Sequence, residues 1–295
     1  MAMNGISRGK PVLSPVSSSA LRAEGLRVAV VGGTGGLGRA IAQLLASKGA
    51  KVTVVGRTFR DAGSPNLDFI AADLESVAES KRVAAALPAE DLDVLIFTTG
   101  IITAPTREVS AEGIERDMAI SYVSRYVILN AVADRLGKNR PGRPRVFVMG
   151  FPGTDEKGNP DDLNAEKKYE QMPAHLNTVA ANEALVLDAA RRYPRLAVFG
   201  VNPGLIKTEI RANVLGGTGS FKFKFVETLI GLFTPTPETY ASRIVPVMLA
   251  AELATESGFH FNKNGVPIEP SKPMTPDHVA AFMTSTERLL GAVPA

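Results

Sequence analysis

The chain has 295 residues, 45% hydrophobic and 21% charged, which suits one large α/β domain or two small ones. Its net charge of +3, without a dense basic patch, argues against a nucleic-acid partner, and the absence of cysteine excludes disulfides and thiolate chemistry. The three histidines lie far apart in sequence, so no metal site is expected, and no apolar run reaches the ~18 residues that a membrane span requires.

The first 24 residues differ in composition from the rest of the chain. They are rich in Ser, Gly and Pro, and they carry Arg8, Lys10 and Arg22 against a single acid, Glu24. A disordered leader or a cloning remnant fits this composition, and so does a transit peptide. We expect a disordered leader over residues 1–24 and one folded domain over 25–295. The expected location is cytoplasmic, or an organelle if residues 1–24 act as a targeting signal.

From residue 26 onward, short apolar runs alternate with amphipathic helical patterns. In chain order the sequence predicts a strand at 28–31, a helix at 39–48, strands at 51–55 and 69–72, a helix at 77–87, a strand at 94–98, a helix at 114–136, a strand at 145–149, a helix at 177–192, a strand at 197–201, a helix at 238–252 and a last strand at 258–262. The alternation predicts right-handed βαβ units. The expected fold is therefore α/β, a Rossmann-type three-layer sandwich with a doubly wound parallel sheet of about seven strands.

A glycine-rich turn joins the first predicted strand to the first helix. Residues 28–38 read VAVVGGTGGLG, and RAIAQLLASKG follows at once. Glycines here allow a tight bend, the close approach of a pyrophosphate and the packing of helix on strand. The N-terminus of the helix offers unpaired N–H groups to the phosphates. The turn predicts a dinucleotide site lined by Gly32, Thr34, Gly35, Gly36, Leu37 and Gly38.

Two long segments interrupt the alternation. Residues 151–173 are polar and typical of a loop, and residues 205–236 contain the apolar stretch FKFKFVETLIGLF. Long segments at the carboxyl ends of parallel strands usually shape a substrate pocket. We expect a pocket lid at about 205–236. A surface that binds a membrane or a partner, and an amphipathic helix packed on the core, are the alternatives.

Together these segments resemble the short-chain dehydrogenase/reductase family over residues 26–262. The glycine turn matches the family's phosphate loop, although Val31 replaces its leading Thr. TPETYA and residues 258–262 resemble the retinol-dehydrogenase-like branch. The resemblance implies further cofactor contacts after the third strand, after the fourth strand and in the NPGLIKT loop after the sixth, which lies beside the nicotinamide. These contacts are Asp73, Leu74, Thr99, Gly100, Pro203, Gly204, Ile206 and Thr208.

The residue after the second strand bears on the choice between NAD and NADP. Arg57 stands where the adenosine ribose is expected, and the nearest acid, Asp61, is four residues further on. An acid at this place would bind the 2′-hydroxyl of NAD, whereas an Arg suits the 2′-phosphate of NADP. Arg39 offers a second charge. We therefore expect NADP(H), although a solvated loop Arg would look the same in sequence.

The resemblance also implies a catalytic Tyr, a Lys four residues later, a Ser and an Asn, and this chain departs at all four positions. The helix that reads NTVAANEALVLDAARRYP places Thr178 at the Tyr and Asn182 at the Lys. The Ser position falls on Phe151 or Gly150, and Ser121 stands at the Asn. A Thr hydroxyl titrates far above the ~10 of Tyr, so it is a poor acid near neutral pH. Asn182 remains able to bond a ribose hydroxyl.

Other residues near this helix are candidates for the missing acid. His175, three residues before Thr178, titrates in the right range and is the first candidate, and Tyr169 is the second. A His near a helix start also fits a purely structural role. Further candidates lie on the 114–136 helix and in the 151–173 loop, where charged residues are equally typical of a solvated surface: Tyr122, Tyr126, Asp155, Glu156, Lys167 and Lys168.

Three functions follow from these patterns. The first is an NADP(H)-dependent oxidoreductase that reduces a small apolar carbonyl or enone with a rearranged proton donor. The second is a non-redox enzyme, such as a cyclase or isomerase, on the same fold, and the third is a catalytically inactive NADP(H)-binding sensor or scaffold. The resemblance further implies a homodimer or homotetramer whose interface is formed by the helices at 114–136 and 177–192.

Overall fold

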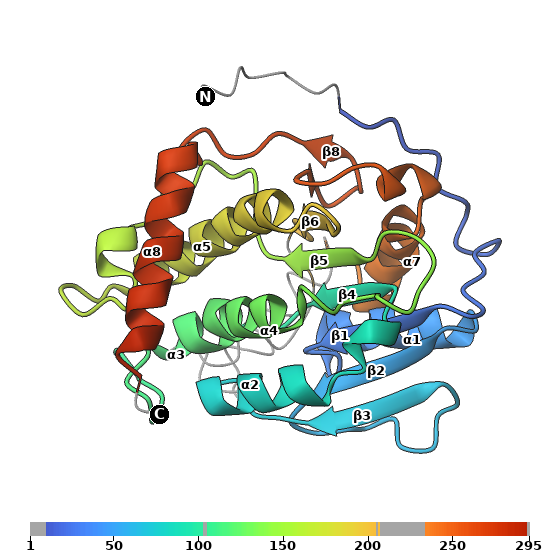
Figure 1. Cartoon of the computed structure of the whole chain (residues 1–295), viewed down its shortest axis with the longest axis horizontal. Helices are drawn as coiled ribbons and strands as arrows, with labels where there is room; N and C mark the ends of the chain where they lie inside the picture. The colour runs from blue at the N-terminus through green and yellow to red at the C-terminus, as the bar shows by residue number, and fades with distance from the viewer. Residues whose placement is uncertain (1–9, 103–104, 205, 207–233, 294–295) are drawn as a thin grey trace.

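The computed structural model describes residues 10–102, 105–204, 206 and 234–293, and their centre is one eight-stranded sheet (Figure 1). The strand order is β3-β2-β1-β4-β5-β6-β7-β8, and β8 alone runs antiparallel to its neighbour. The strands are β1 (Arg27–Val31), β2 (Lys51–Gly56), β3 (Leu67–Ala71), β4 (Val94–Phe97), β5 (Arg145–Met149), β6 (Ala197–Val201), β7 (His260–Phe261) and β8 (Pro267–Ile268). The chain reverses direction across the sheet between β1 and β4, which is where such folds bind ligands.

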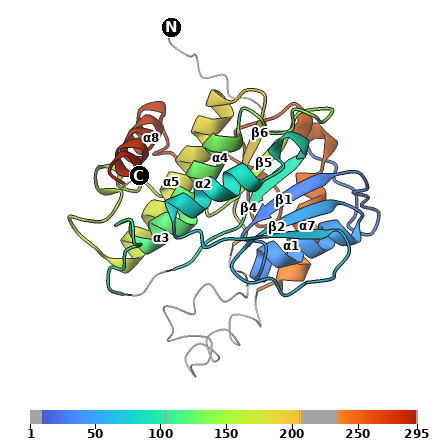
Figure 2. The ribbon, with the colours of Figure 1, turned by 60° about the horizontal axis from the view of Figure 1, so that its bottom comes forward.

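Helices cover both faces of the sheet (Figure 2). On one face lie α1 (Gly36–Ser47) and α7 (Pro237–Met248), and on the other lie α2 (Val77–Ala86), α4 (Ser124–Val132) and α5 (Gln171–Arg192). The chain enters α4 through α3 (Arg116–Met118) and a π-helical turn, η2 (Ala119–Val123). Short 3₁₀ turns are η1 (Ala89–Asp91), η3 (Pro160–Asp162) and η5 (Ala251–Ala254), and the last helix is α8 (Pro276–Gly291).

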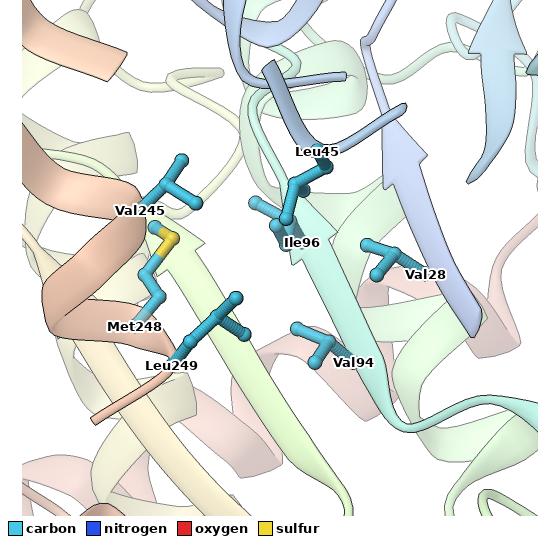
Figure 3. A pocket seen from close by; sticks show the side chains of 7 residues that line it. All are labelled: Val28, Leu45, Val94, Ile96, Val245, Met248 and Leu249. Carbon is cyan, nitrogen blue, oxygen red and sulfur yellow. The ribbon is translucent and has the colours of Figure 1, made fainter. Parts of the chain in front are cut away.

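The apolar pattern of the strands explains why the layers pack tightly. β1, β4 and β6 bury nearly all their side chains, as expected of parallel strands covered on both faces. Figure 3 shows the seam under α1 and α7, which leaves no room for a water molecule. This seam is core and not a ligand pocket. It is lined by Val28, Leu45, Val94, Ile96, Val245, Met248 and Leu249.

The predicted α/β sheet is confirmed, with three differences. The sheet has eight strands instead of about seven, because the two-residue β8 is too short to give a periodic signal. The predicted helix at 114–136 is divided by its π-helical turn, and α5 begins at Gln171 rather than at 177. Helix α8 lies beyond the last predicted element, although Thr275 caps it and Pro276 occupies its first position.

Helix α8 packs along α5 and also contacts the neighbouring helix formed by η2 and α4. The hydroxyls of Tyr122 and Thr286 lie 2.6 Å apart, and Tyr126 donates to Glu287 at 3.4 Å. The family resemblance implied that the helices at 114–136 and 177–192 form a subunit interface. Part of that helix pair is covered here by the chain's own α8.

The end of the predicted leader belongs to the packed domain. Leu21 and Ala23 are buried in the core beside α1, and the Ala23 amide donates to Lys48 O. Upstream, the Ser14 amide donates to Glu252. The domain therefore begins before the predicted boundary at residue 25. Most of the predicted lid, residues 207–233, lies outside the described residues. Every helix within the described residues is too short or too polar to cross a bilayer.

Candidate active site

The glycine turn between β1 and α1 is pressed against the carboxyl end of β4. Gly32 and Gly36 have φ values of +91° and +49°, which disfavour L side chains. A Cβ on Gly32 would lie 2.5 Å from Thr99 N, and one on Gly38 would lie 2.3 Å from Thr98 Oγ1. Glycine is therefore required at these positions by the close approach of the chain.

The N-terminus of α1 is open toward this edge of the sheet. Gly35 is its N-cap residue and has no side-chain cap bond, and a Cβ on Gly35 would meet no atom of the described residues within 4 Å. Uncapped N–H groups beside open space suit an anionic group such as a pyrophosphate. Thr34 packs against Gly56 at the end of β2, and Leu37 packs against the core.

The expected adenosine end has two arginines with different surroundings. Arg57 is exposed directly after β2, and it makes no hydrogen bond or ion pair with any other described residue. Arg39 donates two bonds to Asp61, at 2.8 and 2.6 Å, and these bonds hold the pKa of the Asp61 carboxyl below its usual range. The second charge expected from Arg39 is thus taken up by Asp61, and Arg57 keeps its donors available.

The other predicted cofactor residues gather at the carboxyl ends of the strands. Asp73 and buried Leu74 follow β3, and Thr99 and Gly100 follow β4. The buried Thr99 Oγ1 has no hydrogen-bond partner in the part of the chain that the structure describes. After β6, Gly204 has φ +68° and its amide donates to Asn202. Pro203 is half-buried and Ile206 buried, while Thr208 lies outside the described residues. The glycine turn, the uncapped helix and the orphaned Thr99 hydroxyl fit a dinucleotide.

A polar network joins α5 to the helix that begins with α3. His175 Nδ1 lies 2.6 Å from Asp117 Oδ2, the Asp117 side chain is 1% exposed and that of His175 is 16% exposed. Ser121 donates to the other oxygen of Asp117 and accepts from the Ile101 amide at 3.1 Å. Ser121 lies in the π-helical turn, and such turns occur frequently at functional sites. The carboxylate therefore fixes the orientation of the His175 ring.

Thr178 and Asn182 are buried on the same face of α5 as His175. The Thr178 hydroxyl donates to His175 O at 2.7 Å, within its own helix. Asn182 Nδ2 donates to Ser121 O and Thr178 O, at 2.8 and 2.7 Å. The Thr178 hydroxyl is thus occupied by its own helix, and Asn182 ties α5 to the π-helical turn.

Arg125 completes this network and was not predicted from the sequence. It is 3% exposed and donates to Asn182 Oδ1 at 2.9 Å, to Met149 O and to Thr99 O. Burial lowers the pKa of its guanidinium to about 9. A fully buried Arg is rare unless its charge is paired. The signal available in the sequence was the position of Arg125, four residues after Ser121 on the same helix.

The remaining candidate acids have other surroundings. Tyr122 is fully buried under α8, where desolvation raises the pKa of its hydroxyl, and Tyr126 is 6% exposed beside Glu287. They belong to the α8 packing and not to the site edge. Tyr169 is half-buried in the loop after β5. The charged residues of that loop are mostly exposed, and Asp155 accepts from the Lys272 amide.

A second buried histidine–carboxylate pair also involves α5. Glu183 is 1% exposed, His260 Nε2 lies 3.4 Å from Glu183 Oε1, and Ser271 donates twice to the same carboxylate, at 2.6 and 2.7 Å. Gly153, in the loop after β5, donates at 3.2 Å. Burial alone would raise the pKa of Glu183, but His260 and Ser271 outweigh it and hold the pKa below its ordinary value. Glu183 thus anchors the loop after β5.

Comparison with known proteins agrees with this geometry. The short chain dehydrogenase model matches residues 27–146. The chain is 47% identical over 270 residues to an uncharacterized oxidoreductase of Saccharomyces cerevisiae, covering 89% of this chain and 87% of that protein. It is 24% identical over 268 residues to retinol dehydrogenase 11 of Homo sapiens, covering 86% and 82%. A short-chain dehydrogenase/reductase from Serratia marcescens shares the fold, with TM-score 0.59, 20% identity and coverage of 83% and 99%.

The sheet order and the glycine turn define a Rossmann-type dinucleotide-binding protein. The chain belongs to the short-chain dehydrogenase/reductase family, whose members are oxidoreductases that bind nicotinamide cofactors.

Proposed function

We propose that this protein is an NADP(H)-dependent reductase of a small apolar carbonyl or enone, with an atypical proton donor. The observation that carries the proposal is the glycine turn, which keeps the geometry of a dinucleotide cradle while Gly35 leaves the N-terminus of α1 open. Arg57, exposed and without a described partner, would hold the 2′-phosphate of NADP. When bound, the cofactor supplies the hydride, and the protein orients it.

We assign proton transfer to His175. Its Nδ1 faces the buried Asp117 carboxylate at 2.6 Å, so Nε2 is the ring atom that would exchange a proton with substrate oxygen. Asp117 acts through His175, because it fixes the tautomer and orientation of the ring. Ser121 and the Ile101 amide fix Asp117 in turn. Both amide hydrogens of Asn182 are used, so Asn182 would accept from a ribose hydroxyl at the second lone pair of its Oδ1. Tyr169 is the second candidate for the donor.

A second function is favoured by one observation on the same helix. The Thr178 hydroxyl is bonded to His175 O and lacks the acidity of a Tyr. A protein that binds NADP(H) as a sensor or scaffold, without turnover, needs no acid at this place. A non-redox enzyme on the same fold has no feature of its own here. We further propose a cytoplasmic protein, with residues 1–24 as the part that would redirect it, and a homodimer or homotetramer that uses a face other than the part covered by α8.

The test is a titration followed by a turnover screen. NADPH and NADH are titrated into the purified full chain by nicotinamide fluorescence, and a panel of ketones, aldehydes and enones is then assayed for NADPH oxidation. Binding with turnover supports the reductase, and binding without turnover supports the sensor or scaffold. Binding of neither nucleotide refutes both functions.

A further inference from the structure

The guanidinium of Arg125 is a buried cation whose hydrogen bonds go to neutral acceptors. Its described bonds go to two main-chain carbonyls, Thr99 O and Met149 O, and to the amide oxygen of Asn182. The Asp117 carboxylate acts on it through space, without a described hydrogen bond, and offsets only part of the effect of burial on its pKa. Its Nε is buried and has no hydrogen-bond partner among the described residues. A cation that is 3% exposed without a hydrogen-bonded carboxylate loses hydration that neutral acceptors replace only in part.

The place of this cation is the cofactor edge of the sheet. Met149 is the last residue of β5. Thr99 lies two residues after β4, beside the glycine turn, and a Cβ on Gly32 would strike its amide. Ligands of doubly wound sheets bind at the carboxyl ends of the strands. Arg125 thus lies at the edge of the sheet where the nicotinamide is expected.

The charge of Arg125 also explains the residue at position 182. Asn182 Oδ1 accepts from Arg125 at 2.9 Å while its Nδ2 donates to two carbonyls, so both ends of the amide are used. A Lys at 182 would place an ammonium against the guanidinium in a buried space. One cation is accommodated here, and α4 supplies it.

We propose that Arg125 is the cofactor-site cation of this chain, supplied from α4 rather than α5, and that its charge favours the reduced nicotinamide over the oxidised one. The inference rests on the proposed function, because it requires that the cradle bind NADP(H). The oxidised ring is cationic and the reduced ring is neutral, so a fixed positive charge nearby repels only the oxidised form. A merely structural Arg125 would affect both forms alike.

The experiment is the ratio of two dissociation constants, measured by calorimetry with NADP⁺ and NADPH. In the wild type we expect NADPH to bind about tenfold more tightly than NADP⁺. The variant R125Q should lose most of this preference, and R125Q/N182K, which returns the charge to α5, should recover it. The control is R145Q. Arg145 also donates to a main-chain carbonyl, Met248 O, and burial also lowers its pKa, but it lies at the opposite end of β5.

The outcomes separate the two proposals. If the wild type binds neither nucleotide, the proposed function fails. If the wild type binds both but does not prefer NADPH, or if a folded R125Q keeps the wild-type ratio, the assignment of Arg125 is overturned. If circular dichroism shows that R125Q does not fold, the proposal is tested by the ratio of dissociation constants in the wild type and in R125Q/N182K. A lost preference for NADPH in the folded double variant also contradicts the proposal.

Discussion

The glycine cradle and the α4–α5 network lie at the same edge of the sheet, yet they are built from different material. The cradle is backbone: Gly32 and Gly38 are fixed by contacts that any Cβ would break. The network is side chain: His175, Asp117 and Arg125 meet from three helical segments. A backbone site changes only if glycine is lost, whereas a side-chain site can be rebuilt from neighbouring positions on the same helices. Changes in the backbone cradle should therefore affect cofactor binding, and changes in the side-chain network should affect proton transfer.

The largest expected effect is on the network side. H175Q should lower kcat by about 10²–10³-fold, because it removes the proposed proton donor, and D117N should follow it with a smaller loss. NADPH affinity should stay near that of the wild type in both. H278Q is the control, since His278 is half-buried on α8, outside the network, and its Nε2 contacts Lys157 O. Steady-state kinetics decide, and an unchanged kcat in H175Q would move the proton donor to Tyr169.

The second-largest effect is expected at Glu183, the buried carboxylate on α5. E183Q should lower the free energy of unfolding at pH 7 by roughly 2–3 kcal/mol, because it breaks a buried pair and loosens the loop after β5. The folded pKa of Glu183 is lowered, so its stabilisation is present above the unfolded pKa of about 4.3 and is lost as pH falls through the folded value.

The difference between wild type and E183Q should therefore shrink below about pH 4. Urea unfolding at pH 7 and at pH 3.5 measures it. E269Q is the matched control, because Glu269 is exposed and its ion pair with Lys10 spans 3.9 Å. A constant difference at both pH values would show that Glu183 acts through its shape and not through its charge.

On the cradle side, R57A should weaken NADPH binding by about 10- to 100-fold and leave NADH binding unchanged. The reason is the loss of charge-assisted bonds to the 2′-phosphate, worth roughly 1.5–3 kcal/mol. Nicotinamide fluorescence titration of both nucleotides measures the effect, with R288A on α8 as the control. Equal weakening of NADPH and NADH would contradict the assignment of Arg57.

A smaller effect is expected at the open end of α1. G35A should fold with unchanged thermal stability, because its backbone is extended and the added methyl meets nothing within 4 Å. Cofactor binding should weaken about tenfold, since the methyl would fill the space left for the pyrophosphate. G291A, at another position without near neighbours, should change neither property. Full affinity in G35A would place the phosphates elsewhere.

The smallest effect is expected at Thr178. T178V should keep kcat within about twofold of the wild type, because the hydroxyl serves its own helix by bonding to His175 O. Kinetics of T178V and T178S together measure this. A loss of kcat comparable to that of H175Q would assign the Thr hydroxyl to the chemistry and would join the two halves of the network.

The difference between a site made of adjacent backbone and a site made of distant side chains also explains which features the sequence predicted. β1, β4 and β6 were found because buried parallel strands are continuous apolar runs. The cradle was found because its glycines are adjacent in the chain. Both signals are local, so a pattern of about ten residues contains them.

The contacts of the α4–α5 network, and its members Asp117 and Arg125, were not predicted, for the opposite reason. The partners of Arg125 are 24, 26 and 57 residues away, and Asp117 meets His175 over 58 residues. His175 itself was predicted, from the chemistry of imidazole and from its place three residues before Thr178. The four-residue spacing of Arg125 from Ser121 is a weak local signal, and only the fold shows that its guanidinium meets the ends of two strands.

Helix α8 also gives the folding reaction an order. Tyr122 and Thr286 are separated by 164 residues, so their contact requires the closure of a very long loop. During synthesis the α4 segment leaves the ribosome well before α8, and until α8 arrives the aromatic surface of Tyr122 and Tyr126 faces the surrounding solvent. Exposed apolar surface of this kind makes a partly folded chain prone to aggregation and to chaperone binding. A lesion in α8 should accordingly reduce the yield of folded protein, while the molecules that do fold keep the chemistry of the cofactor edge.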